Sequence, residues 1–554
     1  MRVLIIGGVA GGMSAATRLR RLDETAEIVV FERGSYVSFA NCGLPYHVGG
    51  VIAERDALLL QTPESLRSRF ALDVRIGTEV TTIDRAAQTV TVREVATGET
   101  TTENYDRLIL AMGADDRSRL SPAPDGPVVS TLRTVADVDR IVAALPAGTT
   151  AARAVVAGGG FIGLEAVENL VHRGLQVTLA QHGAHPLSGL DAEMAAPLLD
   201  TLRAHGVQVR TGATVAEVDA TGVTLADGTH IACDLVIDAR GVTPATGLAR
   251  DAGLQIGPAG GIRVDEQQRT SDPRIFAVGD GVEKTDAVTG EPVLVTMAGL
   301  ANRHGRHIAD VIAAERTGVD PDAMPPALGT GIIQVFETTA AMTGGSEQRL
   351  RAAGLPHRAI HTHPSHHATY YPGAERMSMK LMVDPESDRI LGAQIVGGRG
   401  VDKRIDVIAT AMQAGITASG LSRLELAYAP QFASAKDPVN LIGYAADNLA
   451  TGLTAGIQWH ELDAALSDGA TLIDVRSAEE YAGGGIPSSV NVPLDELRDR
   501  LGELPAGELI VHCQVGQRGH TAARLLAQTG RAVRNLDGGY LTWRDGARMS
   551  GQER

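Results

Sequence analysis

Residues 154–180 read AVVAGGGFIGLEAVENLVHRGLQVTLA, and this stretch decides the fold. A short apolar strand leads into a complete G-x-G-x-x-G motif at Gly158, Gly160 and Gly163, and a helix and a second strand, Gln176–Ala180, follow. Glycines at this spacing let the backbone approach a pyrophosphate at a helix N-terminus. The stretch therefore predicts a dinucleotide-binding βαβ unit, and a purely structural glycine turn is the weaker interpretation.

The end of the second strand bears on which nucleotide this unit binds. An acid there binds the ribose hydroxyls of NAD, whereas an arginine nearby accommodates the extra phosphate of NADP. Gln181 occupies the position, so the preference between NADH and NADPH stays open. We expect the nicotinamide nucleotide to contact the loop and the start of the helix, at Gly158, Gly160, Phe161, Ile162, Gly163 and Glu165.

The same pattern opens the chain. Val3–Ile6 is a short apolar run, glycines follow, and a helix ending at Leu22 leads to a strand, Glu27–Phe31. Glu32 supplies the acid expected after the second strand, but Val9 replaces the middle glycine of the motif. Taken alone, this degenerate motif fits a glycine-rich turn as well as a nucleotide site.

A segment far downstream changes that balance. Arg274–Asp280 reads RIFAVGD and resembles the second FAD signature of flavoproteins with two dinucleotide-binding domains. The resemblance implies FAD at the first unit, with Asp280 at the ribityl and phosphate end. The residues that it implies around FAD are Gly7, Gly8, Ala10, Gly11, Gly12, Glu32, Arg33, Asn41, Gly113, Gly279 and Asp280.

Composition and charge limit the class of protein. A formal net charge of −16 gives no overall attraction to nucleic acid or to an anionic membrane. No run approaches the ~20 uninterrupted apolar residues that a membrane-spanning helix needs, and Met1–Ala16 is interpreted as a strand and glycine loop rather than a signal peptide. The three cysteines form no disulfide framework, so we expect a cytoplasmic protein with catalytic thiol chemistry. Cys233 adjoins an apolar strand and is expected to be inert.

The segment SFANCGLPYH, residues 38–47, follows the first unit closely and would place Cys42 near the flavin. A lone buried cysteine is the alternative interpretation. The segment resembles coenzyme A disulfide reductases of the single-cysteine flavoprotein disulfide reductase family, in which the cysteine alternates between a thiolate and a mixed disulfide with CoA. Relatives with an internal disulfide carry a C-x4-C pair, but His47 stands in the second position, so the second sulfur must come from outside.

The helix after the first glycine loop carries Ser14, Arg18 and Arg21 at helical spacing. Spacing alone favours a solvated basic face over a ligand site. The family resemblance implies instead that these side chains bind CoA. The other residues that it adds to the CoA set are Ser38, Asn41, His366 and Lys436.

Two further segments, residues 366–373 and 428–436, resemble the dimerisation domain of that family. In it, tyrosines reach the cysteine of the partner subunit and donate hydrogen bonds to its thiolate. The resemblance implies this role for Tyr370 and Tyr428, with Tyr371 as the register alternative. Four histidines nearby lack an accompanying cysteine or acid cluster, so we expect no metal site.

The C-terminal module carries a second sulfur motif. Cys513–Arg518 reads CQVGQR between an apolar strand and a helix, a loop that directs backbone N–H groups at an anionic sulfur. Spacing alone also fits a phosphatase. Four flanking motifs resemble the rhodanese family instead: LIDVR at 472–476, GIP at 485–487, NVP at 491–493 and GGY at 538–540.

One position departs from the rhodanese pattern, because Gly484 stands where many rhodaneses carry a histidine. An inactive rhodanese scaffold is therefore the alternative. Retention of Cys513 and Arg518 favours an active sulfurtransferase, in which both residues are catalytic.

Together these features predict an α/β protein of several domains. We expect two Rossmann-like domains, an α+β dimerisation domain after a proline-rich break at Pro321–Pro326, and an α/β rhodanese domain. The expected boundaries are 1–147 with 269–325 for FAD, 148–268 for NAD(P)H, 326–450 for dimerisation and 451–554 for rhodanese. The strands expected to close the two nucleotide-binding units are Val90–Val95, Leu108–Gly113 and Leu235–Gly241.

Over its whole length the chain resembles fusions of coenzyme A disulfide reductase with rhodanese. The resemblance implies a homodimer that passes electrons from NADH or NADPH through FAD and Cys42 to CoA persulfide or polysulfide and releases sulfide, with Cys513 handling sulfane sulfur. Plain CoA disulfide reduction is the nearest alternative. An NADH oxidase or peroxidase is another, although Ala10 stands where such relatives carry a histidine, and a non-catalytic sulfane-sulfur sensor or carrier is the last.

Overall fold

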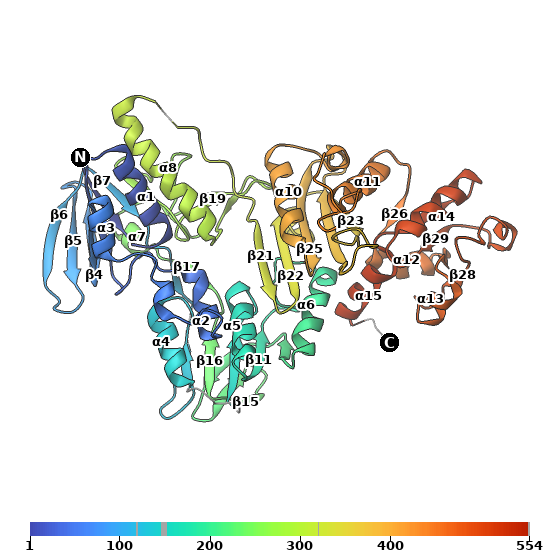
Figure 1. Ribbon diagram of the computed structural model, residues 1–554, viewed down its shortest axis with the longest axis horizontal. Coiled ribbons are helices and arrows are strands. Elements are labelled where there is room, and N and C mark those ends of the chain that lie inside the picture. Colours follow the sequence, from blue (N-terminus) through green and yellow to red (C-terminus); the bar gives the residue numbers. More distant parts are fainter. Residues whose placement is uncertain (118–119, 146–151, 320, 552–554) are drawn as a thin grey trace. The chain divides into compact units, whose positions relative to one another are not determined.

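The computed structural model describes residues 1–117, 120–145, 152–319 and 321–551. The chain divides into two compact units (Figure 1). The first unit comprises Met1–His182 and Gly212–Gly329, and the second comprises Gly183–Thr211 and Thr330–Arg554.

A parallel five-stranded sheet forms the centre of the first nucleotide-binding fold. Its strand order is β18-β7-β1-β2-β3, so β1 lies in the middle and its glycine loop opens at the carboxyl edge of the sheet. The strands are β1 (Arg2–Ile6), β2 (Glu27–Glu32), β3 (Asp73–Ile76), β7 (Arg107–Leu110) and β18 (Ile275–Ala277).

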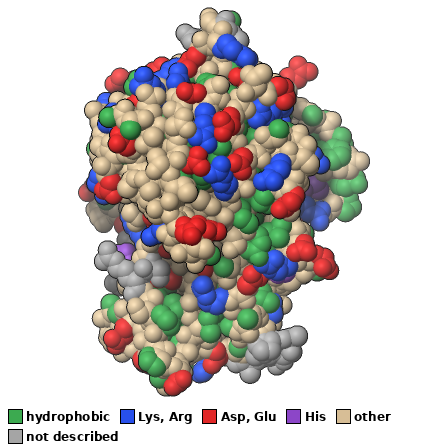
Figure 2. All heavy atoms as spheres, turned by 90° about the vertical axis from the view of Figure 1, so that its left-hand side faces the viewer, with side chains coloured by type: hydrophobic (Ala, Val, Ile, Leu, Met, Phe, Trp, Pro, Cys, Tyr) green, Lys and Arg blue, Asp and Glu red, His purple; other side chains and the backbone are tan. Residues whose placement is uncertain are grey.

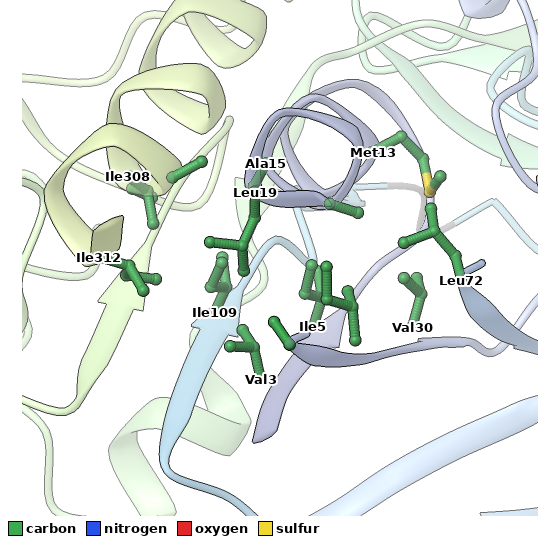
Figure 3. Packing of buried hydrophobic residues seen from close by; sticks show 14 of the residues in the cluster. Val3, Ile5, Met13, Ala15, Leu19, Val30, Leu72, Ile109, Ile308 and Ile312 are labelled. Carbon is green, nitrogen blue, oxygen red and sulfur yellow. The ribbon is translucent and has the colours of Figure 1, made fainter. Parts of the chain in front are cut away.

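Two helices, α1 (Ala10–Leu22) and α8 (Ala298–Thr317), pack together over one face of this sheet. Figure 3 shows the apolar side chains between helices and strands, among them Ile5, Leu19 and Ile308. All three are fully buried. Each such side chain contributes about 1.5–3 kcal/mol through its removal from water, so this cluster holds the glycine loop in place.

An antiparallel sheet of three strands, β4 (Thr78–Asp84), β5 (Thr89–Glu94) and β6 (Thr100–Asn104), contributes to a second core with Leu4 and Phe31 of the first sheet. The expectation that residues 90–95 close the βαβ unit is wrong, because β5 is the middle strand of this separate sheet. Its inward residues alternate with outward ones, as in a sheet with one solvated face.

The second nucleotide-binding fold contains the parallel strands β11 (Gln176–Gln181), β10 (Arg153–Ala157), β16 (Leu235–Asp238) and β9 (Val128–Ser130), in this order. The helices α5 (Phe161–His172) and α4 (Val135–Ala144) accompany them. A small antiparallel sheet follows, with β13 (Val215–Val218), β14 (Gly222–Leu225) and β15 (His230–Ala232).

The two nucleotide-binding folds divide the chain differently from the expected boundary at 147/148. β9 precedes that boundary, yet it pairs with β16 of the second fold. Conversely Ala249, Leu254 and Ile262, which fall in the expected NAD(P)H segment, pack in the core around Leu4. The remaining short elements of this unit are α2 (Leu44–Val48), α3 (Pro63–Phe70), β8 (Ala114–Asp116), β17 (Val242–Pro244), α7 (Gly247–Asp251), β19 (Lys284–Thr285) and β20 (Pro292–Val293).

The second unit begins with an antiparallel sheet of order β21-β22-β25-β24-β23. Buried apolar side chains join it to two helices, α10 and α11. α6, which precedes this sheet by more than a hundred residues in the chain, packs against β25. The bounds are α6 (Ala192–Ala204), β12 (Gln208–Thr211), β21 (Gly331–Val335), β22 (Thr338–Gly344), α9 (Glu347–Ala352), β23 (Arg358–Thr362), β24 (Met377–Val383), β25 (Ile390–Gly397), α10 (Val401–Gln413) and α11 (Pro438–Ala450).

The C-terminal module of the second unit is a parallel sheet of order β26-β30-β29-β27-β28 flanked by helices. The mixed α/β fold expected from the sequence is confirmed. The bounds are β26 (Gly456–Ile457), α12 (Leu462–Ser467), β27 (Thr471–Asp474), α13 (Ala478–Ala482), β28 (Val490–Asn491), β29 (Leu509–His512), α14 (Gln517–Gln528), β30 (Val533–Leu536) and α15 (Gly539–Met549).

The surface carries charges of both signs. On the face drawn in Figure 2, basic and acidic side chains are interspersed with apolar ones, and no broad basic patch of the kind that binds nucleic acid stands out there. Within the described ranges, no helix combines the length and apolar character needed to cross a membrane.

Candidate active site

The first glycine loop is tightly folded around Glu32. Gly7 has a φ of +106°, and a Cβ on Gly12 would overlap the carbonyl oxygen of Gly7, so both positions require glycine. Glu32 accepts hydrogen bonds from the backbone N–H groups of Gly8 at 2.8 Å and Gly34 at 2.7 Å. In the part of the chain that the structure describes, no side chain caps the N-terminus of α1. Its free N–H groups and helix dipole therefore fit an anionic phosphate.

The carboxyl ends of β7 and β18 bring Gly113 and Gly279 to the same edge. A Cβ on Gly281 would lie 2.6 Å from the carbonyl oxygen of Gly113, which shows how closely the two loops approach. Asp280 follows Gly279, and burial raises its pKa while the charges of Lys284 and Arg133 oppose that rise.

Lys284 fixes this loop, and the sequence analysis missed it. Its Nζ donates hydrogen bonds to the carbonyl oxygens of Gly279 at 2.6 Å and Val282 at 2.9 Å. Burial lowers the pKa of Lys284 to about 8. A single lysine four residues after the aspartate of the FAD signature is the only signal that the sequence offered.

Cys42 lies on a 3₁₀ helix, Asn41–Gly43, immediately before α2. Ser38 has a φ of +50° and donates its N–H to the carbonyl oxygen of Gly8 at 2.8 Å, so the cysteine segment is tied directly to the first glycine loop. Cys42 and Asn41 are exposed to solvent. Neighbouring protein atoms nevertheless hinder hydration of the thiolate, and with the charges of Glu165 and Asp280 they raise the pKa of Cys42.

Glu165 links the second nucleotide-binding fold to this cysteine. It lies in α5, and burial together with the charge of Glu168 raises its pKa to about 7. The hydroxyl of Tyr46 hydrogen-bonds to Glu165, and burial raises the pKa of Tyr46 to about 12. A carboxyl group with a pKa near 7 beside a cysteine thiol suits proton exchange at neutral pH. Sequence analysis did not single out Tyr46.

The second glycine loop repeats the geometry of the first with one chemical change. A Cβ on Gly163 would overlap the carbonyl oxygen of Gly158, and Gly159 donates its N–H to the side-chain oxygen of Gln181 at 2.8 Å. Gln181 thus takes the structural place of Glu32 without its charge. The other expected contacts line an open loop, since Gly160 has space for a Cβ, Phe161 is half-buried and Ile162 is exposed.

The side chains expected to bind CoA differ in their present partners. Ser14 donates a hydrogen bond to Asn302 at 2.6 Å, and Arg18 pairs with Asp310 at 2.7 Å, so both face α8. Arg21 is exposed. Arg33, expected near FAD, is exposed and lies 3.7 Å from Glu79.

In the second unit, the expected tyrosines meet. The hydroxyl groups of Tyr370 and Tyr428 are 2.8 Å apart, and the two residues are 74% and 49% exposed. Tyr371 instead packs edge-on against the ring of His367. His366 is buried with its Nδ1 accepting the N–H of Glu375, and Lys436 is exposed.

One group among the described residues has the spacing of a metal site. It consists of the buried carboxylates of Asp191, Glu193 and Glu347. The ammonium group of Lys380 already lies among them, 2.9 Å from Asp191 and hydrogen-bonded to both glutamates. A lysine therefore takes the cation position. Cys233 is buried in an apolar core, and burial raises its pKa to about 11.

Cys513 is fully buried at the start of the loop between β29 and α14. Its carbonyl oxygen accepts the N–H of Tyr540 at 2.8 Å. Arg518 hydrogen-bonds to Cys513 and forms two hydrogen bonds of 2.7 Å with Glu480, and this pairing lowers the pKa of Glu480 to about 2. Sequence analysis missed Glu480 because it lies on α13, far from the loop in sequence.

Nearby, Arg476 forms a buried ion pair with Asp474 at 2.6 Å and lies over the ring of Tyr540 at 4.7 Å. Its Nη1 donates to the side-chain oxygen of Gln514 at 3.2 Å. The loop of Cys513 is therefore supported by polar contacts and a cation–π contact of Arg476, which lies outside the CQVGQR motif.

Comparison with known proteins matches three parts of the chain to families. Residues 1–306 match pyridine nucleotide-disulphide oxidoreductase, residues 332–438 match its dimerisation domain, and residues 458–545 match the rhodanese-like domain. Coenzyme A disulfide reductase of Staphylococcus epidermidis is 34% identical over 445 residues, which cover 80% of this chain and 99% of the relative.

Two solved structures are similar over nearly the whole chain. The reduced CoADR-RHD of Bacillus anthracis is 44% identical with a TM-score of 0.95, covering 99% of this chain and 98% of that one. A NAD-dependent persulfide reductase from A. fulgidus is 38% identical with a TM-score of 0.89, covering 98% and 100%.

Proposed function

The chain belongs to the pyridine nucleotide-disulphide oxidoreductase family and carries a rhodanese-like domain, and on that premise we propose that it reduces CoA persulfide or polysulfide to sulfide. It is an FAD-dependent oxidoreductase that acts on sulfur with NAD(P)H as the electron donor. The uncapped first glycine loop, closed by Glu32, fits FAD, and the loop at Gly158–Gly163 fits the nicotinamide nucleotide. Bound FAD supplies a path for an electron pair from NAD(P)H to sulfur.

In the proposed reaction, Cys42 forms and loses one bond to sulfur. Its thiolate attacks the CoA-bound sulfur of CoA persulfide, the S–S bond breaks and hydrosulfide leaves, which gives a mixed disulfide between Cys42 and CoA. An electron pair from NAD(P)H then cleaves the mixed disulfide into the Cys42 thiolate and CoA thiol. The sum, persulfide plus hydride giving thiol plus hydrosulfide, balances in atoms and charge. His47 in place of a second cysteine leaves CoA as the natural partner of Cys42.

Cys513 has the complementary task of carrying the sulfur atom. Its thiolate takes the outer sulfur of a sulfane-sulfur donor, and the donor leaves as a thiol or sulfite. The cysteine persulfide then passes that sulfur to a CoA thiolate. Arg518 stabilises the charge on sulfur, and Glu480 orients Arg518 through two hydrogen bonds.

The observation that carries this proposal is the presence of two separate cysteine sites in one chain. Cys42 is exposed next to the first glycine loop, and Cys513 is buried in a complete rhodanese loop with its arginine. A sulfurtransferase has no evident task in reducing a simple disulfide, whereas it supplies a persulfide reductase. The tyrosine pair Tyr370 and Tyr428, on the domain that matches the dimerisation family, is proposed to reach Cys42 of a second copy in a homodimer.

Plain CoA disulfide reduction is the second candidate, favoured by the name and coverage of the Staphylococcus epidermidis relative. Anaerobic oxidation of NADH and NADPH with CoA persulfide and with CoA disulfide, together with sulfide release, separates the two. We expect faster turnover with CoA persulfide and stoichiometric sulfide. Preference for CoA disulfide, with equal rates for wild type and Cys513→Ser on sulfane-sulfur donors, would make the simpler reductase correct.

A further inference from the structure

His361, on β23 of the second unit, connects the dimerisation domain to the rhodanese module. Its backbone N–H and its Nδ1 both contact one carboxylate oxygen of Asp537, at 2.9 and 2.6 Å. Its Nε2 lies 3.2 Å from a carboxylate oxygen of Glu193. Carboxylates accept hydrogen bonds, so both ring nitrogens must donate and the ring is an imidazolium. The side chain of His361 is 1% exposed, which makes this a fully buried charged bridge.

On the Glu193 side, further ion pairs hold the bridge in place. Glu193 also accepts a hydrogen bond from Lys380, whose ammonium group contacts Asp191 and Glu347 as well. Removing one partner of such a buried pair is strongly destabilising, because it leaves the other charge unpaired and away from water. The carboxylate of Glu193 is therefore held in a fixed position beside His361.

On the Asp537 side, the bridge adjoins a turn that packs against the loop of Cys513. Asp537 begins the turn that runs through Gly538 and Gly539, and a Cβ on Gly538 would lie 2.8 Å from the Cβ of His361. On its other side the same turn meets the loop of Cys513, since a Cβ on Gly539 would overlap the carbonyl oxygen of Cys513. No side chain fits between the turn and either neighbour, so a shift of the turn displaces the catalytic loop.

Two further side chains, Gln458 and His363, hold the turn in the same position. Gln458 donates from its side-chain amide to Asp537 at 3.2 Å and to the carbonyl oxygen of Ala359 on β23 at 2.9 Å. His363, two residues after His361, lies 2.8 Å from the hydroxyl of Thr542. The contacts of Gln458 with Ala359 and of His363 with Thr542 join the rhodanese module to β23 and to the residue that follows it.

We propose that His361 is a positioning residue for Cys513: through Asp537 it sets the turn that shapes the rhodanese loop, so the dimerisation domain completes the sulfurtransferase site. The inference rests on the proposed function, because sulfur transfer at Cys513 is the reaction being positioned. His361 itself touches no reacting atom. The rhodanese module of this chain is thus a dependent part of the enzyme and not a self-sufficient appendage.

The charges around His361 predict how the bridge responds to pH. Burial and Lys380 oppose the imidazolium, whereas Asp537 and Glu193 favour it, and the pKa of His361 is raised to about 9. Burial, together with the charges of His361, Arg376 and Arg544, lowers the pKa of His363 to about 3, so His363 stays neutral. The pKa of His361 in the folded protein lies above its ordinary value of 6.5. The stability that the charged bridge contributes is therefore fully present below pH 6.5 and is lost as the pH rises through about 9.

The test uses full-length Asp537→Asn and His361→Gln, with Asp200→Asn as the control. Asp200 pairs with Arg548 at 2.8 Å between α6 and α15, so the control breaks an ion pair of the same junction away from the turn. Three readouts are needed: sulfur transfer from thiosulfate to cyanide, hydrogen exchange of residues 513–518, and anaerobic NADH oxidation with CoA disulfide.

We expect both bridge variants to lose sulfur transfer by about tenfold or more, since small misplacements of a reacting group are costly. Residues 513–518 should exchange faster, while CoA disulfide reduction and the control stay at wild-type levels. In wild type, after correction for intrinsic exchange, the protection of this loop should fall near pH 9. Asp537→Asn, which keeps its shape and loses only its charge, should show no such step.

Unchanged exchange and unchanged transfer in Asp537→Asn would overturn the inference. Equal losses in Asp200→Asn would also overturn it, because they would reduce the effect to general loosening of the junction. If wild type transferred no sulfur at all, the proposed role of Cys513 would fail, and the exchange data would still decide whether His361 positions the loop.

Discussion

The two cysteines of the proposed reaction, Cys42 and Cys513, lie in opposite surroundings. Cys42 is exposed on a short 3₁₀ helix, and the charges nearest to it, Glu165 and Asp280, disfavour its thiolate. Cys513 is buried in a loop that carries its own cation, Arg518. The contrast teaches that, under the proposed function, the site of Cys42 is open to a large thiol and gains stabilisation from what binds there, whereas the site of Cys513 is preformed around sulfur.

The largest effect expected from this contrast comes from removing the exposed sulfur. Cys42→Ser should lower NADH oxidation with CoA disulfide and with CoA persulfide by about 10³-fold or more, because no other described thiol lies in the reductase site to replace the nucleophile. Sulfur transfer to cyanide should be unaffected. Anaerobic stopped-flow and cyanide assays on one preparation measure both, and a parallel loss of transfer would show that the two cysteines do not work at separate sites.

The next effect concerns the cation of the preformed site. Arg518→Gln should lower sulfur transfer by about 100-fold, comparable to the loss of one preorganised donor at a developing negative charge. CoA disulfide reduction should not change. Glu480→Gln keeps Arg518 but weakens its anchor, so its rate of sulfur transfer should lie between those of wild type and Arg518→Gln. A rate for Arg518→Gln equal to that of wild type would show that Arg518 does not stabilise the charge on sulfur.

A third change acts only on the electron supply to Cys42. Gln181→Glu adds a negative charge at the end of β11, where an acid in this fold binds the ribose hydroxyls of NAD and would repel the extra phosphate of NADP. We expect the ratio of kcat/KM for NADPH to that for NADH to fall by about tenfold, equivalent to ~1.4 kcal/mol. Binding of both nucleotides measured by calorimetry should show the same ratio, and an unchanged ratio would mean that Gln181 does not face the ribose.

The smallest expected effect is a shift in the titration of Cys42. Glu165 carries a pKa of about 7, so above that pH its negative charge holds the pKa of Cys42 up. Glu165→Gln should therefore move the pH midpoint for alkylation of Cys42 by iodoacetamide downward, by up to about one unit. Alkylation of Cys42→Ser, measured in parallel, gives the background from the two buried thiols. An upward shift, or none, would remove Glu165 from the environment of the thiol.

Local sequence signals predicted the fold and the three segments that carry the candidate sites. The glycine loops, the cysteine segment and the CQVGQR loop are each about ten residues long or shorter, so they can be recognised from the sequence alone. The pairing of Tyr370 with Tyr428 was also within reach, because both lie in segments that resemble one family domain.

What the sequence did not predict depends on contacts between distant residues. The partners Arg518 and Glu480, or His361 and Asp537, lie on different elements, and no local pattern records their proximity. The pairing of Arg18 with Asp310 likewise reflects the packing of α1 on α8, and helical spacing alone gave no sign of it. The placement of β5 in a separate sheet required knowledge of which strands pair.

Lys380 has a bearing on the chemistry that the protein is proposed to perform. Three buried carboxylates close enough to coordinate a divalent ion are instead crosslinked by an amine, which is bonded covalently to the chain. Carboxylate clusters of this kind suit hard cations such as Mg²⁺ and Ca²⁺. With Lys380 in that place, the contacts that hold Glu193 beside His361, and with them the proposed positioning of the rhodanese loop, do not depend on a bound divalent ion.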